Sequence, residues 1–262
     1  MTMEILIGIM VFIFGLVFGS FYNVVGYRLP NNMSIIFPGS HCPNCNHELK
    51  FYELIPVLSY IFQGGKCRKC KKKISVIYPF FELLTGTLFL LSYLVFGISI
   101  DFFICITFLS ILVIITISDI KYYIIPDEVL IVGSVFLIIE LCIKMYLNKL
   151  GWVNGLFLPI LNGLASFSAL YLIKILGDFL FKKESLGGGD IKLMFVMGLV
   201  LGFPMSMTLI FIASFIALPI SIYTLFKKDT NVLPFGPYLA LAGALIILLQ
   251  IDFSMVLKLF LE

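Results

Sequence analysis

Three aspartates stand at the ends of apolar segments, where a carboxylate is costly and is a functional candidate by default. They are Asp119, Asp127 and Asp190. Asp127 follows Pro126 and begins an apolar segment, so a helix N-cap role explains it. Asp119 ends an apolar segment, where the helix dipole disfavours an anion, so its position predicts a role beyond capping.

Asp190 follows three glycines, Gly187, Gly188 and Gly189, and opens another apolar segment. The glycines let backbone, from this chain or from a substrate, approach the carboxylate closely. Two interpretations stay open, a flexible turn capped by Asp190 or a partner for Asp119. Two converging aspartates can share one proton, so that the ionised one activates water and the protonated one polarises a carbonyl. From the helix dipole, we expect Asp119 to be the acid and Asp190 the base.

The elements that must position these residues are membrane helices. Hydrophobic residues make up 61% of the 262 positions and charged residues only 13%, against about 25% in soluble domains. The mean hydropathy of +1.10 indicates that a bilayer covers this apolar surface. We expect an all-α polytopic membrane protein with about eight spans, the sixth of which is short. The expected spans lie near residues 5–27, 76–97, 102–118, 128–147, 154–177, 191–202, 205–226 and 236–251.

The distribution of Lys and Arg predicts the orientation. With the N-terminus outside, 15 of the 18 basic residues fall on the cytoplasmic side, together with all three aspartates. The N-terminal segment has no basic region and no cleavage site, so we interpret it as a retained span. The expected domains are a first span (1–27), a cytoplasmic loop domain (28–75) and a helical core (76–262).

The loop domain carries two CxxC motifs, Cys42 with Cys45 and Cys67 with Cys70. Two such knuckles predict a structural zinc site of four thiolates, resembling a zinc ribbon. A cytoplasmic location disfavours disulfides. The only histidines, His41 and His47, flank the first knuckle and are alternative ligands.

Residues 66–73 hold six basic side chains. They either anchor the loop against anionic lipid or bind an acidic partner.

The chain as a whole resembles the type IV prepilin peptidases, a family of polytopic aspartic proteases. No nucleophilic triad or metalloprotease motif competes with this resemblance. The matching motifs occur in the family's order, and their combination is highly specific. They are Gly19 to Val25 with Arg28-Leu29-Pro30, His41 to Cys45, Ile55 to Tyr60, Gly65 to Cys70, Ile74-Ser75, Tyr78-Pro79 with Glu82 to Gly86, Asp119 to Asp127, Gly187 to Lys192, and Pro234 to Pro237.

The resemblance implies that Asp119 and Asp190 are catalytic, with Gly187, Gly188, Gly189, Asp127 and Lys192 in support. Members cut the short basic leader of prepilins or pseudopilins after a glycine, at the cytoplasmic face of the bacterial membrane. Many then methylate the new N-terminus with S-adenosylmethionine, and these carry the large first loop that this chain has. The implied partners are the leader, the hydrophobic N-terminal helix of the prepilin and membrane lipid, without nucleic acid.

One further acidic residue has two interpretations. Glu82 in the second span either binds the methyl donor or an amine, or makes a polar contact between helices.

Two other functions remain as alternatives. An ion- or proton-coupled transporter would also have carboxylates at span ends and broken helices. A zinc-stabilised assembly adaptor would tolerate the loss of both aspartates.

Overall fold

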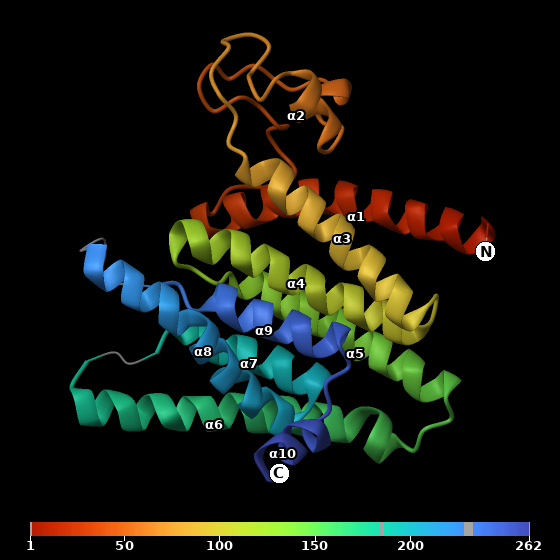
Figure 1. The fold of residues 1–262 in the computed structure, drawn as a ribbon, viewed down its shortest axis with the longest axis vertical. Helices are drawn as coiled ribbons and strands as arrows, with labels where there is room; N and C mark the ends of the chain where they lie inside the picture. Colours follow the sequence, from red (N-terminus) through yellow and green to blue (C-terminus); the bar gives the residue numbers. More distant parts are fainter. Residues whose placement is uncertain (1, 184–185, 228–232, 262) are drawn as a thin grey trace. The chain divides into compact units, whose positions relative to one another are not determined.

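The computed structural model describes residues 2–183, 186–227 and 233–261 (Figure 1). The described part is almost entirely helical and contains no strand, only two isolated β-bridges. Its α-helices are α1 (Thr2–Arg28), α2 (Leu58–Phe62), α3 (Ile77–Phe96), α4 (Ile100–Tyr122), α5 (Asp127–Leu147), α6 (Leu158–Phe181), α7 (Gly188–Leu201), α8 (Phe203–Lys227), α9 (Gly236–Leu248) and α10 (Phe253–Leu261). Two 3-10 turns, Leu29–Asn31 and Phe51–Glu53, and a π-helical turn, Val153–Phe157, complete the described elements.

Each of the eight expected apolar segments corresponds to a helix, which confirms the polytopic all-α architecture. Among the described helices, six are long and apolar enough to cross a membrane, namely α1, α3, α4, α5, α6 and α8. α7 has 14 residues and α9 has 13. At 1.5 Å per residue each is about 20 Å long, shorter than the ~30 Å hydrocarbon layer. α10 was not expected, and a left-handed Gln250 separates it from α9.

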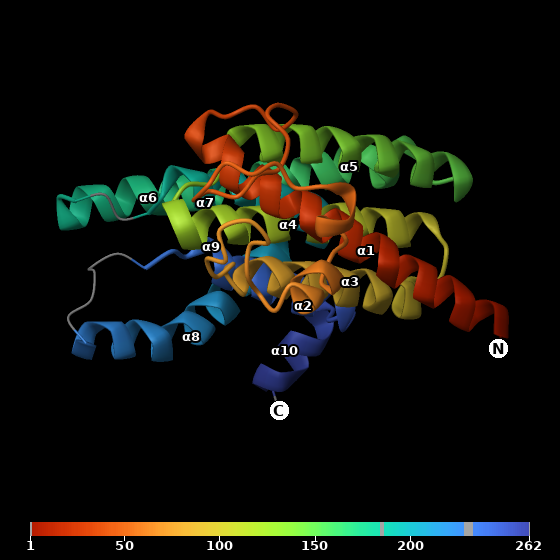
Figure 2. The same ribbon diagram turned by 90° about the horizontal axis from the view of Figure 1, so that it is seen from above.

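The chain divides into two compact units, Met1–Ile98 and Ser99–Glu262. In the first unit, α1 and α3 lie side by side, as both views show (Figures 1 and 2). Their backbones approach closely because glycines face the partner helix. A Cβ added to Gly15 would lie 2.7 Å from Gly86 Cα, and one added to Gly19 would lie 2.8 Å from Glu82 Cα. Small residues serve the same purpose at helix interfaces in membranes generally.

The second unit is built around α4, whose side chains Phe108, Leu109 and Ile115 are almost completely buried. The helices α5, α7 and α9 all contact α4. α6 packs against α7, and the hydroxyls of Ser166 and Ser206 hydrogen-bond at 2.6 Å between α6 and α8. The two short helices α7 and α9 therefore both begin beside the C-terminal part of the most buried span.

Candidate active site and metal-binding module

Asp119 lies in the last turn of α4 and is buried. Its Oδ2 accepts a hydrogen bond of 2.9 Å from the backbone N–H of Gly236, the first residue of α9. The N-terminal end of a helix carries free N–H groups and a partial positive charge. α9 thus supplies the compensation for the Asp119 carboxylate that the sequence around Asp119 lacks.

The contact between these two residues requires glycine. A Cβ on Gly236 would lie 2.7 Å from Asp119 Oδ2. The backbone of Gly236 is not left-handed, so the requirement comes from close approach and not from conformation. The motif Pro234 to Pro237 contributed to the family resemblance, but no role was predicted for Gly236 itself.

Asp190 lies in the first turn of α7 and is also buried. Gly187 is the N-cap of this helix, so the interpretation of Asp190 as the cap is wrong. Asp190 Oδ1 has no hydrogen-bond partner among the described residues. Gly236, which holds Asp119, and Gly189, which precedes Asp190, both lie against the side chain of Ile125, so the structure brings the two predicted aspartates into one region. Two carboxylates in such a site can share a proton and divide acid and base roles.

Ile125 connects the elements that carry the pair. The loop after α4 is fixed by the Ser118 hydroxyl, which donates to the Ile124 carbonyl at 2.5 Å. Ile125 then packs closely against α7, since a Cβ added to Gly189 would lie only 2.7 Å from the Cβ of Ile125. Its Cδ1 would lie 3.4 Å from a Cβ on Gly236. One side chain thus contacts the first residue of α9 and the first turn of α7, which sequence reasoning did not anticipate.

The three glycines before Asp190 are not equivalent. A Cβ on Gly187 would lie 3.0 Å from Asp190 Oδ2, whereas one on Gly188 would meet no atom within 4 Å. Together with the tight contact at Gly189, this means that the first and third glycines make room for neighbours and the second does not.

Asp127 and Lys192 form an ion pair between α5 and α7, at 2.7 and 2.8 Å from the two carboxylate oxygens. Pro126 is the N-cap of α5 and Asp127 makes no capping bond, so the expected cap role of Asp127 is wrong. Lys192 is two residues after Asp190, which places it about 200° around the helix, on the opposite face of α7. The ion pair therefore links α5 to α7 on the face of α7 that points away from Asp190.

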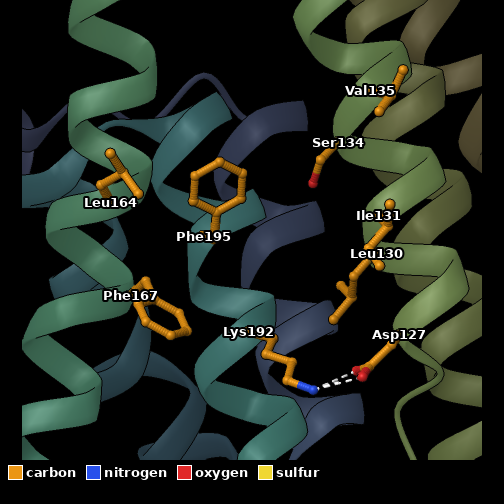
Figure 3. Close-up of a pocket in the computed structure, with 9 residues that line it drawn as sticks. All are labelled: Asp127, Leu130, Ile131, Ser134, Val135, Leu164, Phe167, Lys192 and Phe195. Atoms are coloured by element: carbon orange, nitrogen blue, oxygen red, sulfur yellow. Dashed lines mark hydrogen bonds and ion pairs between the residues drawn. The ribbon is translucent and has the colours of Figure 1, made fainter.

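That opposite face borders a groove of about 480 Å³ between α5, α6 and α7 (Figure 3). The polar groups that line this groove are the Asp127–Lys192 ion pair and the Ser134 hydroxyl, and the other lining side chains are apolar. The lining residues are Asp127, Leu130, Ile131, Ser134, Val135, Leu164, Phe167, Lys192 and Phe195.

The cysteine motifs form two matching turns in the first unit. Cys42 N–H donates to the His47 carbonyl and Cys67 N–H to the Lys72 carbonyl, both at 2.9 Å. The β-bridges that close the turns join residues 41 with 48 and 66 with 73, a constant shift of 25 residues. The two knuckles are therefore local repeats of one another, whereas we expected no internal repeat from the sequence.

The four thiols fit a tetrahedral metal ion. Their sulfur atoms lie within 4.8 Å of one another, with Cys42–Cys70 at 3.8 Å and Cys45–Cys67 at 3.9 Å. A tetrahedron with zinc–sulfur bonds of about 2.3 Å has edges of about 3.8 Å. Backbone N–H groups, first that of Asn44, lower the pKa of Cys42 to about 7, and those of Cys70 and Lys69 lower the pKa of Cys67.

The two histidines, which were the alternative metal ligands, contact oxygen atoms of the loop and not the cysteine cluster. His41 Nδ1 lies 2.9 Å from the Gly39 carbonyl, and His47 Nε2 lies 3.4 Å from Glu53 Oε2. Glu53 is buried, accepts the Lys50 N–H at 2.9 Å and lies 3.8 Å from Arg68 Nε. A carboxylate to which the sequence assigned no role thus contacts residues beside both knuckles.

Glu82 is buried in α3, and its Oε2 accepts the backbone N–H of Val57 at 2.7 Å. Glu82 also hydrogen-bonds to the side chain of Ser20 in α1, so it makes the expected polar contact between helices as well as one to the loop.

Comparison with known proteins covers both units. The profile described as "Bacterial Peptidase A24 N-terminal domain" matches residues 13–96, and that of the "Type IV leader peptidase family" matches residues 106–222. The chain is 38% identical to the "Prepilin leader peptidase/N-methyltransferase" of Bacillus subtilis (strain 168), over 92% of this chain and 93% of that protein. It is 33% identical to the "Type 4 prepilin-like proteins leader peptide-processing enzyme" of Escherichia coli O78:H11, over 90% and 91%. No solved structure matches it significantly.

These matches give no support to the transporter alternative. A relative above 30% identity that is covered almost completely, together with two profiles of one peptidase class in chain order, leaves a single assignment. The chain belongs to the type IV leader peptidase family.

Proposed function

We propose that this protein is a membrane aspartic endopeptidase that removes the short basic leader of a prepilin or pseudopilin after a glycine. The observation that carries the proposal is that buried Asp119 contacts the N-terminal end of α9 and buried Asp190 lies at the N-terminal end of α7, with Ile125 packed against both ends. The names of the relatives, which include prepilin leader peptidases, support the substrate class.

In the proposed reaction the aspartates share one proton. Asp119 receives the Gly236 N–H, which stabilises its ionised form, whereas Asp190 Oδ1 lacks a donor among the described residues. These contacts favour Asp119 as the base and Asp190 as the acid, the reverse of the assignment that the helix dipole of α4 alone predicted. Asp119 would take a proton from water as that water attacks the scissile carbonyl. Asp190 would donate a hydrogen bond to the carbonyl oxygen.

A second proposed activity is methylation of the new N-terminus, with S-adenosylmethionine as co-substrate. Its support is the name of the relatives and the match of residues 13–96. We propose that the loop domain 28–75 serves this activity and that residues 76–262 form the peptidase core. Glu82 stays a candidate for this step, although its contact with Val57 favours a structural role.

Zinc is proposed as a structural ion on Cys42, Cys45, Cys67 and Cys70. When bound, it would cross-link the two knuckles of a loop that has a small core. No chemical step is assigned to it.

The proposed orientation puts the N-terminus outside and the aspartates at the cytoplasmic face, because this places most basic residues inside. The hydrophobic helix of the prepilin would then enter from the bilayer, with its leader on the cytoplasmic side.

The test incubates the purified protein with a prepilin and S-adenosylmethionine and identifies products by mass spectrometry. Asp119→Asn and Asp190→Asn should each reduce cleavage by about 10²- to 10⁴-fold, the usual contribution of acid–base catalysis. Asp101→Asn is the matched control, since Asp101 lies at the other end of α4 and pairs with Lys144. It should cleave normally.

Normal cleavage by either variant of the pair would refute the catalytic assignment. If both variants cut normally, the adaptor interpretation would regain support. Methylation is read in the same spectra, and a cleaved product without the added methyl mass would refute the second activity alone.

A further inference from the structure

The loop between α1 and α3 contains an uncharged stretch that the proposed activities do not use. Residues 54–65 include no Asp, Glu, Lys or Arg, although the next eight residues carry six basic side chains. Twelve residues are too few to span a membrane. An apolar run of this length is typical of a buried or an interfacial segment.

The helix in this stretch, α2, has an apolar outer face. Leu58, Ile61 and Phe62 are spaced as i, i+3 and i+4 and are 52%, 63% and 80% exposed. On the other side of α2, Tyr60 packs against Gly65, where an added Cβ would lie 2.9 Å from the Tyr60 hydroxyl. The loop module is thus built on one side of α2, and three large apolar side chains point away from it.

A hydrogen bond holds the start of α2 against a membrane helix. The Val57 N–H donates to Glu82 Oε2 at 2.7 Å. Glu82 lies five residues after the start of α3, about 7–8 Å along the helix. Figures 1 and 2 both draw α2 near the N-terminal part of α3. The start of α2 therefore lies at the level of the second turn of a candidate membrane span.

The backbone at Val57 is strained to make this contact. Val57 has φ 60° and ψ −51°, and Leu58 N–H turns back to the Pro56 carbonyl at 2.5 Å. Such a γ-turn is rare, and a β-branched residue in this region persists only where its surroundings enforce it. In this conformation the Val57 N–H donates to the carboxylate of Glu82, a buried residue.

We propose that α2 is an interfacial helix whose Leu58, Ile61 and Phe62 face is buried in the bilayer at the headgroup–acyl boundary. The occupant of this face is lipid because the same compact unit contains two candidate membrane helices, α1 and α3. The hydrogen bond between Val57 and Glu82 holds the start of α2 beside α3. The basic run 66–73 that follows fits anionic headgroups. This inference does not depend on the proposed peptidase or methyltransferase activity.

The test measures the depth of single tryptophans in lipid nanodiscs. Trp152 is the only tryptophan, so Trp152→Phe provides the background. Phe62→Trp reports on α2 and Ile61→Trp repeats the measurement. Glu48→Trp is the control, because Glu48 is exposed on the first knuckle and lies outside the basic run. Each protein is placed in lipid with or without bromine on the acyl chains and titrated with aqueous iodide.

Trp at positions 61 and 62 should be quenched several-fold more by brominated lipid than Trp at position 48, and should resist iodide. Iodide access at positions 61 and 62 equal to that at position 48 would place α2 in water and overturn the proposal. Protection from iodide without bromine quenching would mean that protein, such as a second copy of the chain, covers the face, and would also overturn it. Zinc content per chain verifies that each variant has folded.

Discussion

Replacement of Gly236 by alanine tests whether the start of α9 holds Asp119, the proposed catalytic carboxylate. The added Cβ would lie 2.7 Å from Asp119 Oδ2, about 0.7 Å inside the 3.4 Å at which ordinary contact begins. A displacement of that size stretches the 2.9 Å hydrogen bond from Gly236 beyond the usual 3.2 Å limit. A hydrogen bond to a charged group contributes about 1.5–3 kcal/mol. Because 1.36 kcal/mol is a factor of ten, cleavage should fall about 10- to 100-fold.

The assay is single-turnover cleavage of a prepilin by protein in nanodiscs, with thermal unfolding measured in parallel. Gly188→Ala is the matched control, because a Cβ there meets no atom within 4 Å. It should cleave at the wild-type rate and unfold at a similar temperature. If Gly236→Ala cleaved within twofold of wild type, or if Gly188→Ala were equally impaired, the proposed support of Asp119 by α9 would be refuted.

Other substitutions separate the roles of neighbouring residues. Gly189→Ala places a Cβ 2.7 Å from the Cβ of Ile125, so we expect a loss of stability of about 1–3 kcal/mol, measured by thermal unfolding. Adding Ile125→Ala to the same chain should restore part of the lost stability. Asp127→Asn should reduce cleavage less than tenfold and stability by at most about 1 kcal/mol, because its pair with Lys192 is half exposed; a loss as large as that of Asp119→Asn would place Asp127 in the catalytic machinery. The native protein should contain one zinc ion per chain by elemental analysis. Cys70→Ser or acidification should release the zinc, because thiolate ligands are lost, and a protease should then cut the loop before it cuts the helices. Retention of zinc by Cys70→Ser would contradict the four-thiolate site.

The capping interpretations failed for one physical reason. The sequence places Asp127 and Asp190 near helix starts, but backbone conformation decides which residue is the N-cap, and the observed caps lie one and three residues earlier. Pro126 and Gly187 hold the cap positions, so both carboxylates are free for contacts with other helices. Boundary errors of this size are inherent in reading apolar runs, and here they decide whether an aspartate caps its own helix.

The acid–base assignment shows a second limit. The dipole of α4 was a sound local argument for Asp119 as the acid, yet the N-terminal N–H of a helix more than a hundred residues later acts on the same carboxylate. Local electrostatics cannot include a donor whose position depends on packing.

The sequence alone indicated the membrane class, the order of eight apolar helices, the four cysteines and, through the order of motifs, the two candidate aspartates. These features depend on composition, on local spacing and on side-chain chemistry, all of which can be read along a chain. Only the tertiary structure decided that Gly236 holds Asp119, that Ile125 contacts both short helices, that Asp127 pairs with Lys192 on the far face of α7, and that Glu82 holds the loop. Each of these is a contact between residues distant in sequence, and the packing of glycine-lined helices, which local preferences do not encode, brings them within a few ångströms.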